Sequence, residues 1–198
     1  MPNWCYNKTT ITGDKNELLK FRNGLQWNTN CYTICESFFP CPQELRDTVS
    51  GFFGDSEKQA ELEAKSQANI EKYGYANWYD WSNAMWGSKW GDCETVMEFD
   101  GEKQIVLSYN SAWSPITEAL QKISTDFPLL KFHTQVDEEG GFFAGVIVIQ
   151  DGETLCEALY EPSSYAGEID WDDLATIEAY ENWKDEQMEQ MLKTAESV

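Results

Sequence analysis

The apolar run from Phe142 to Ile149 is the longest in the chain, and it limits the folds open to it. A membrane-spanning helix needs roughly 20 apolar residues, so this run is far too short to cross a membrane. Turn-forming segments at 137–141 and 151–152 bound it, which predicts a buried strand from Phe142 to Gln150. The segments on either side predict further strands at 130–136 and 154–159.

Other strands are predicted nearer the N-terminus. Apolar residues alternate from Thr95 to Ser111 on both sides of the turn pair Asp100-Gly101, which predicts a hairpin. The β-branched residues at 9–12 indicate a short strand that ends at Gly13. The segment from Tyr32 to Phe39 is also expected to be a strand, stopped by the prolines that follow it.

Two helices are expected between these strands. Asp14 and Glu17 have the spacing of a capping box, and a helix is predicted from there to about Gly24. Ser114-Pro115 should open the second helix, and Phe127-Pro128 should end it. The resulting order of elements predicts an α+β fold, a ferredoxin-like antiparallel sheet with helices on one face.

The stretch at about 49–92 has a different character. Several glycines interrupt it, the polar segment Ser56–Tyr73 predicts a helix, and a group of tryptophans follows. We interpret it as a Trp-rich insertion in a ferredoxin-like domain at 1–160. Residues 161–198 are predicted to form an acidic helical C-terminal extension.

Negative charge is concentrated in the last quarter of the chain. The formal net charge is −21, and residues 151–198 contain 14 acidic and two basic residues. Because binding to phosphate backbones depends on Lys and Arg, this balance argues against direct nucleic-acid binding. A helix predicted from Asp170 to Ala195 carries the candidate partner-binding residues, which are Asp170, Asp172, Asp173, Glu178, Glu181 and Asp185.

The tryptophans are the second candidate site. Aromatic side chains beside a lysine can stack a planar ligand or anchor a protein partner, but they can equally form a small core that packs the insertion on the sheet. Both interpretations stay open at this point. The candidate ligand-binding residues are Trp81, Trp86, Lys89, Trp90 and Trp113.

Signals for catalysis, metal binding and cofactor binding are weak. His133 is the single histidine and is expected at a surface or an edge, and no nucleophile elbow or phosphate-binding loop occurs. The cluster Cys31, Cys35 and Cys41 lacks the paired spacing of structural zinc sites. We therefore expect no catalytic residues, no metal and no cofactor.

The start of the chain has no secretory pattern, which predicts a cytoplasmic protein with free thiols.

Several motifs, taken in order, carry a family resemblance. They are Asn3–Asn7, Phe39–Leu45, Tyr79-Asp80-Trp81 with Trp86–Trp90, Ser111–Pro115, Phe127-Pro128, and Asp137–Gly140 with Phe143–Gly145. This ordered set resembles the YubB ferredoxin-like (Api-like) family of phage and plasmid proteins, whose function is not established. The resemblance implies a ferredoxin-like fold and a phage or plasmid origin, and it implies no mechanism. The acidic terminal helix is more elaborate than the family pattern.

Two functions are consistent with these features. The first is a non-catalytic accessory protein that binds and inhibits a host or defence protein, with carboxylates placed where DNA phosphates would dock. The alternative is a small-molecule binder or enzyme that uses the Trp-rich insertion as a pocket for a nucleotide or metabolite. The sequence does not predict the oligomeric state.

Overall fold

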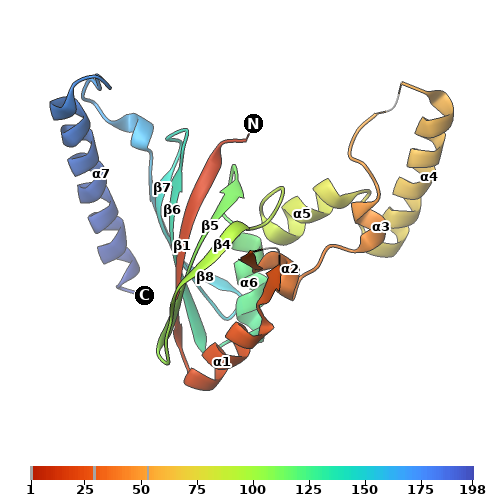
Figure 1. The fold of residues 1–198 in the computed structure, drawn as a ribbon, viewed down its shortest axis with the longest axis horizontal. Coiled ribbons are helices and arrows are strands. Elements are labelled where there is room, and N and C mark those ends of the chain that lie inside the picture. The colour runs from red at the N-terminus through yellow and green to blue at the C-terminus, as the bar shows by residue number, and fades with distance from the viewer. Residues whose placement is uncertain (1, 29, 53) are drawn as a thin grey trace.

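The strands form one antiparallel sheet in the computed structural model, which describes residues 2–28, 30–52 and 54–198. The eight strands of this described part have the order β2-β3-β4-β5-β1-β6-β7-β8 (Figure 1). Their bounds are β1 Trp4–Gly13, β2 Gln26–Asn28, β3 Cys31–Thr33, β4 Cys93–Asp100, β5 Gln104–Ala112, β6 Leu130–Glu138, β7 Ala144–Gln150 and β8 Glu153–Tyr160.

The helices of the described residues lie between these strands and after the last of them. They are α1 Lys15–Gly24, α2 Cys35–Phe38, α3 Gln43–Arg46, α4 Ser56–Tyr73, α5 Trp78–Trp86, α6 Thr117–Asp126, the short 3-10 helix η1 Pro162–Ser164, and α7 Leu174–Ala195. None of them is long and apolar enough to cross a membrane. The predicted helices at Ser56–Tyr73 and after Asp14 are confirmed, and α6 begins two residues after the predicted Pro115.

The centre of the sheet is β1, which pairs with β5 on one side and β6 on the other. The hairpins β4–β5, β6–β7 and β7–β8 lie where the turn sequences predict them. The first strand begins at Trp4, several residues before the predicted segment, because it pairs along its length with both neighbours. The ferredoxin-like α+β fold is therefore confirmed.

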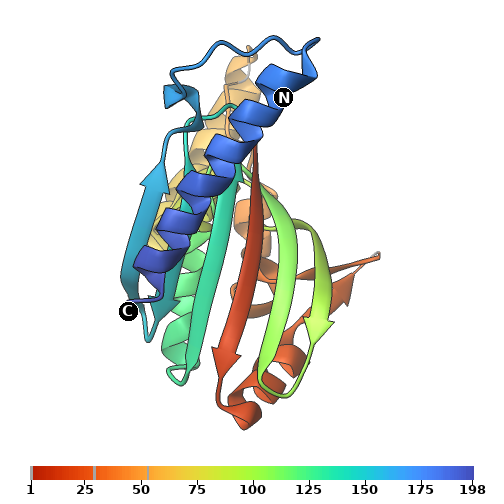
Figure 2. The same ribbon diagram turned by 90° about the vertical axis from the view of Figure 1, so that its left-hand side faces the viewer.

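The two faces of the sheet are covered differently. Side chains of α1 and α6 pack on one face with Ile147 and Ile149 of β7, and this cluster is the main core. The opposite face of β7 carries Val146 and Val148, which pack under α7. The prediction placed helices on one face, whereas α7 lies obliquely over the other face and leaves β1, β4 and β5 uncovered there (Figure 2). Since both faces of β7 are apolar, each needs a cover.

One predicted strand is wrong. The strand expected from Tyr32 to Phe39 ends at Thr33, and α2 follows it directly. The carboxylate of Asp92 accepts hydrogen bonds from the backbone N–H groups of Ile34 (2.8 Å) and Cys35 (2.7 Å). The side chain of Asp92, which is distant in sequence, therefore satisfies amides at the start of this short helix. Cys31 lies in β3 and Cys35 in α2, so the two cysteines do not share a strand.

The capping box at α1 forms only in part. Asp14 Oδ1 accepts hydrogen bonds from the N–H groups of Asn16 and Glu17, as predicted. The Glu17 carboxylate, however, accepts a hydrogen bond from the backbone N–H of Leu129 at 3.1 Å. It therefore contacts the segment before β6, and α1 is fixed to the rest of the domain at its first turn.

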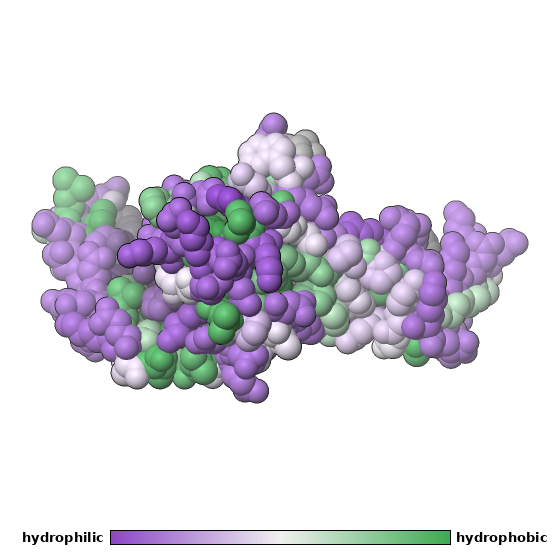
Figure 3. All heavy atoms as spheres, turned by 90° about the horizontal axis from the view of Figure 1, so that it is seen from below, coloured by the Kyte–Doolittle hydropathy of each residue, from purple (hydrophilic) through white to green (hydrophobic). Residues whose placement is uncertain are grey.

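The Trp-rich insertion divides into two parts. The helix α4 extends away from the sheet, whereas α5 lies beside α6 (Figure 1). Trp81 and Trp86 of α5 belong to the main core, so the second part is continuous with the domain. Seen from below, the two ends of the molecule, formed by α7 and α4, are largely hydrophilic (Figure 3).

Candidate functional site

Two of the motifs quoted above meet at one end of the sheet. The hydroxyl of Ser88 donates a hydrogen bond to the carbonyl of Ala112 (3.2 Å) and accepts one from its N–H (3.1 Å). The hydroxyl of Ser114 donates to the carbonyl of Gly87 at 2.5 Å. Ser88 is fully buried. These bonds clamp the segment after α5 against the end of β5.

The clamp gathers aromatic rings around one ammonium group. The Nζ of Lys89 lies 4.7 Å from the ring centroid of Trp90 and 5.4 Å from that of Trp113. The ring centroids of Tyr79 and Trp78 lie 5.8 and 6.0 Å from the same atom. Distances of about 6 Å or less permit cation–π attraction. We call this set of four rings with its lysine the Lys89 cage.

The backbone of Trp113 is unusual. Its φ is +64°, in the left-handed region, which is a rare conformation for a bulky residue. The N–H of Trp113 donates to the carbonyl of Asn3 at 2.9 Å, which helps to hold this conformation. Such residues cost roughly 1–3 kcal/mol, and they occur often at functional sites. Here the conformation brings the half-exposed indole over Lys89.

A groove of about 370 Å³ adjoins the cage. Trp86 is buried in its wall, and the indole N–H of this residue donates to the carbonyl of Phe39 at 3.0 Å. Its lining consists of Glu36, Cys41, Arg46, Trp78, Ser82, Trp86, Lys89 and Trp90, and we call it the tryptophan groove.

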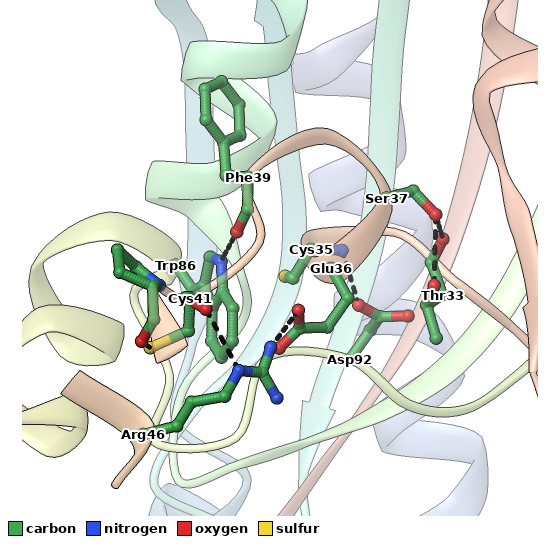
Figure 4. A network of polar contacts seen from close by, with 10 residues as sticks. Thr33, Cys35, Glu36, Ser37, Phe39, Cys41, Arg46, Trp86 and Asp92 are labelled. Carbon is green, nitrogen blue, oxygen red and sulfur yellow. Dashed lines mark hydrogen bonds and ion pairs between the residues drawn. The ribbon is translucent and has the colours of Figure 1, made fainter. Parts of the chain in front are cut away.

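The opposite wall of the groove comes from α2 and α3. Arg46 forms an ion pair with Glu36, and its Nε donates to the carbonyl of Cys41 at 3.0 Å (Figure 4). Asp92 and Cys35 lie beside this pair in the same view, where Asp92 caps α2. No pattern in the sequence pointed to Glu36 or Arg46, although the Phe39–Leu45 motif lies between them.

The five residues predicted to bind a ligand divide into three positions. Lys89, Trp90 and Trp113 lie in the cage, where the two indoles are 40% and 46% exposed. Trp86 lines the groove from the core. Trp81 is buried and packs edge-to-face on Trp86 with a centroid distance of 5.0 Å, so it supports the wall from behind. Trp81 and Trp86 therefore belong to the core, whereas binding of a ligand or partner by the exposed members of the group stays a prediction.

The predicted acidic residues near the C-terminus form two groups. Asp173 caps α7 by accepting the N–H of Ala175, and Asp170 accepts the N–H of Asp172. This first group organises the loop before the helix. The second group comprises Glu178, Glu181 and Asp185, which are exposed on α7 with the spacing of a single helix face. We call this second group the acidic stripe.

The inner face of α7 contacts the sheet through side chains that the sequence did not predict. Met188, Met191 and Leu192 pack against Val146 and Val148. Lys184 Nζ donates to Asp137 Oδ2 on β6 at 3.0 Å. Burial by itself would lower the pKa of Lys184, but the hydrogen bond and the charge of Asp137 outweigh it and hold this pKa above its ordinary value.

The cysteines are free thiols in the structure. Burial raises the pKa of Cys35 well above its ordinary value and that of Cys5 to about 12. A thiol held in its protonated form is a poor nucleophile. His133 was expected at a surface or an edge; it lies half-buried on the internal strand β6, so the edge position is wrong. Among the described residues, no group of three potential ligands is placed to hold a metal ion.

Comparison with known proteins identifies a family. The model described as the ferredoxin-like domain in Api92-like protein matches residues 85–190, which is more than half of the chain. One similar solved structure is the crystal structure of a protein api92 from Yersinia pseudotuberculosis. Its sequence is 11% identical to this chain, the TM-score is 0.44, and the match covers 85% of this chain and all of that one. No curated protein matches the chain.

The family assignment rests on the family model alone. Its matched region contains β4 to β8, α6 and most of α7. The terminal helix, which was expected to be more elaborate than the family pattern, therefore lies largely inside the matched region. The chain belongs to the family of Api92-like proteins that share this ferredoxin-like domain.

Proposed function

We propose that this protein is a non-catalytic accessory protein of phage or plasmid origin that binds and inhibits a host or defence protein. The binding surface is the acidic stripe on α7, and the partner presents a basic surface. The observation that carries the proposal is that the three carboxylates of the stripe are exposed on a helix whose Met188, Met191 and Leu192 pack on the protein's own sheet.

The charge of the stripe is balanced only in part within the chain, since the charge of Glu181 contributes to the raised pKa of Lys184. In the part of the chain that the structure describes, no basic side chain forms an ion pair with Glu178, Glu181 or Asp185. The two lysines of α7 are engaged elsewhere, since Lys184 pairs with Asp137 and Lys193 pairs with Glu189. The carboxylates of the stripe are therefore available to attract a basic partner.

Docking of α7 also gives the stripe a fixed backbone. Packing on β7 and β8 holds this 22-residue helix, because most helical stability in proteins comes from tertiary packing of an apolar face. Carboxylates on a preorganised helix imitate a short row of phosphates without flexibility, which lowers the entropy lost on binding. This supports inhibition of a DNA-binding partner by DNA mimicry.

The test compares two variants of equal charge. The triple variant Glu178→Gln, Glu181→Gln, Asp185→Asn neutralises the stripe. The control Glu61→Gln, Glu63→Gln, Glu71→Gln makes the same charge change on exposed positions of α4. Each protein serves as bait in nuclease-treated bacterial lysate, and mass spectrometry identifies what is bound.

The proposal expects one stoichiometric protein with the wild type and the α4 control, and its loss with the stripe variant. Duplex DNA should displace that protein from the wild type if the stripe imitates phosphates. Equal capture by all three baits, or by none, contradicts the proposal. Retention in the presence of excess DNA contradicts mimicry alone.

A further inference from the structure

We propose that the tryptophan groove binds a small molecule that carries a planar aromatic ring and an anionic group. Lys89 receives the anionic group, and the indoles of Trp78 and Trp90 stack on the ring. This site is independent of the acidic stripe, because it uses other residues at another end of the sheet.

The groove is already ordered in the free protein. The Ser88 clamp fixes the segment that carries Lys89 and Trp90, and the bond from Trp86 to Phe39 fixes the indole in the wall. Its volume of about 370 Å³ lies at the lower end of the range for ligand pockets, about 300–1,000 Å³. A preformed pocket of this size suits a small molecule rather than a polymer.

The charge of the groove favours an anion. Two cationic side chains, Lys89 and Arg46, line it with a single carboxylate, that of Glu36. The local balance is therefore positive on a chain whose net charge is −21. Glu36 is already paired with Arg46, so its charge is engaged.

Lys89 is the cation that remains for a ligand. Among the described residues it forms no ion pair, although the chain has 35 acidic side chains and 14 basic ones. The ring faces of the cage attract its ammonium but do not neutralise it. The ammonium also fills the cage itself, so a cationic ligand would find the position occupied and would be repelled.

The aromatic walls favour a planar ring. Of the indoles that line the groove, Trp90 is 40% exposed and Trp78 is partly exposed, which leaves apolar ring surface in contact with water. Stacking of a ligand ring on such a surface contributes roughly 0.5–1.5 kcal/mol beyond the burial of its area. Trp113 does not line the groove but contacts Lys89 within the cage, where its left-handed backbone, a kind of local strain that often occurs at binding sites, holds the indole near the ammonium.

Titration of the full-length protein with four probes tests the ligand class. Adenosine 5′-monophosphate and indole-3-carboxylate each combine a planar ring with an anion, one a phosphate and the other a carboxylate. Adenosine supplies a ring alone, and inorganic phosphate supplies an anion alone. Calorimetry should show at least one ring-bearing anion binding at least tenfold more tightly than adenosine and phosphate. Failure of both ring-bearing anions to bind at about 1 mM overturns the proposal.

Three variants then test the residues. Lys89→Met removes the charge but keeps a long side chain that packs well among aromatic rings, and it should weaken binding at least tenfold. Lys103→Met, in the exposed β4–β5 turn, is the matched control and should bind as the wild type does. Glu36→Gln removes the only carboxylate of the groove and should tighten binding about threefold.

Circular dichroism and thermal melting show whether each variant is folded. A folded Lys89→Met variant that binds like the wild type overturns the assignment of Lys89. Weaker binding by Glu36→Gln contradicts the electrostatic argument. Loss of partner capture by the stripe variant has no bearing on these results, so the two proposals fail separately.

Discussion

Lys184 of α7 and Asp137 of β6 form an ion pair with an Nζ–Oδ2 distance of 3.0 Å, and it joins the terminal helix to the sheet. The lysine side chain is 22% exposed, the lowest fraction among the lysine and arginine ion pairs of the described residues. The hydroxyl of Tyr160 on β8 donates to the backbone carbonyl of Lys184. One residue of α7 therefore contacts two strands at once.

Replacing Lys184 with Met should loosen α7. The variant loses the bond to Asp137, and we expect a loss of about 1 kcal/mol in the local stability of the helix. Hydrogen exchange should become faster in Leu174–Ala195 and stay unchanged in β1. Lys193→Met is the control, because its partner Glu189 lies on the same helix and both side chains are exposed. Equal exchange in the two variants would show that the ion pair does not anchor α7.

His133 should titrate below its ordinary pKa of 6.5. Burial is the largest effect and lowers the pKa of the imidazole. A backbone hydrogen bond and the negative charge of Glu196 raise this pKa, whereas the positive charge of Lys131 lowers it further. The imidazole lies on the face of the sheet that α7 covers, because it pairs with Val148. The single histidine gives one resolved NMR signal, whose midpoint measures this pKa directly.

The sign of the resulting pH dependence follows from this shift. The unfolded chain takes up the proton at a higher pH than the folded chain does, so stability falls as the pH falls through the folded pKa. The melting temperature of the wild type should drop more between pH 7 and about pH 5.5 than that of His133→Gln. An equal drop would mean that His133 contributes nothing to this pH dependence.

Gly13 should not tolerate a side chain. Its φ is +144°, and a Cβ there would overlap the backbone carbonyl oxygen of Leu129. Gly13→Ala should destabilise the fold by about 3 kcal/mol or more in urea denaturation. Gly51→Ala, where a Cβ would meet nothing within 4 Å, should have a small effect. A similar change in both variants would mean that the turn after β1 adapts to the methyl group.

Ser88→Ala should break the clamp beneath the Lys89 cage. The buried N–H and carbonyl of Ala112 would both lose the Ser88 partner, which we expect to cost about 1 to 3 kcal/mol. Tryptophan emission should shift to longer wavelength, because the indoles of Trp90 and Trp113 become more exposed. Ser197→Ala, at the exposed C-terminus, is a matched control. Unchanged emission in a folded Ser88→Ala variant would show that the cage does not depend on the clamp.

Local signals account for the part of the fold that the sequence predicted. Turn pairs such as Asp100-Gly101 and Asp151-Gly152 locate the hairpins, and Phe127 caps the end of α6 as the following proline predicts. The helix at Ser56–Tyr73 lies between the capping Asp55 and the left-handed Gly74, both of which are local features. Each of these elements depends on residues that are close together in the sequence.

The features that were missed depend on distant residues. Asp92 caps α2 from 57 positions away in the chain, so no local pattern at Cys35 indicates a helix. Glu36 and Arg46 reach the tryptophan groove only after α2 and α3 have folded. The spacing of the tryptophans showed that they cluster, but only the packed structure separates buried Trp81 from half-exposed Trp90.

The double-sided burial of β7 has a consequence for strand alignment. In most half-buried strands, a shift by one residue would move polar side chains into the core, and this penalty fixes the register. That penalty is weak in β7, since Val146 and Ile147 face opposite sides and are both apolar. Gly145 supplies the missing constraint, because its φ is +149° and a Cβ there would overlap the carbonyl oxygen of Ala158 on β8. The register of β7 is therefore fixed by the missing side chain of Gly145 rather than by a hydrophobic pattern.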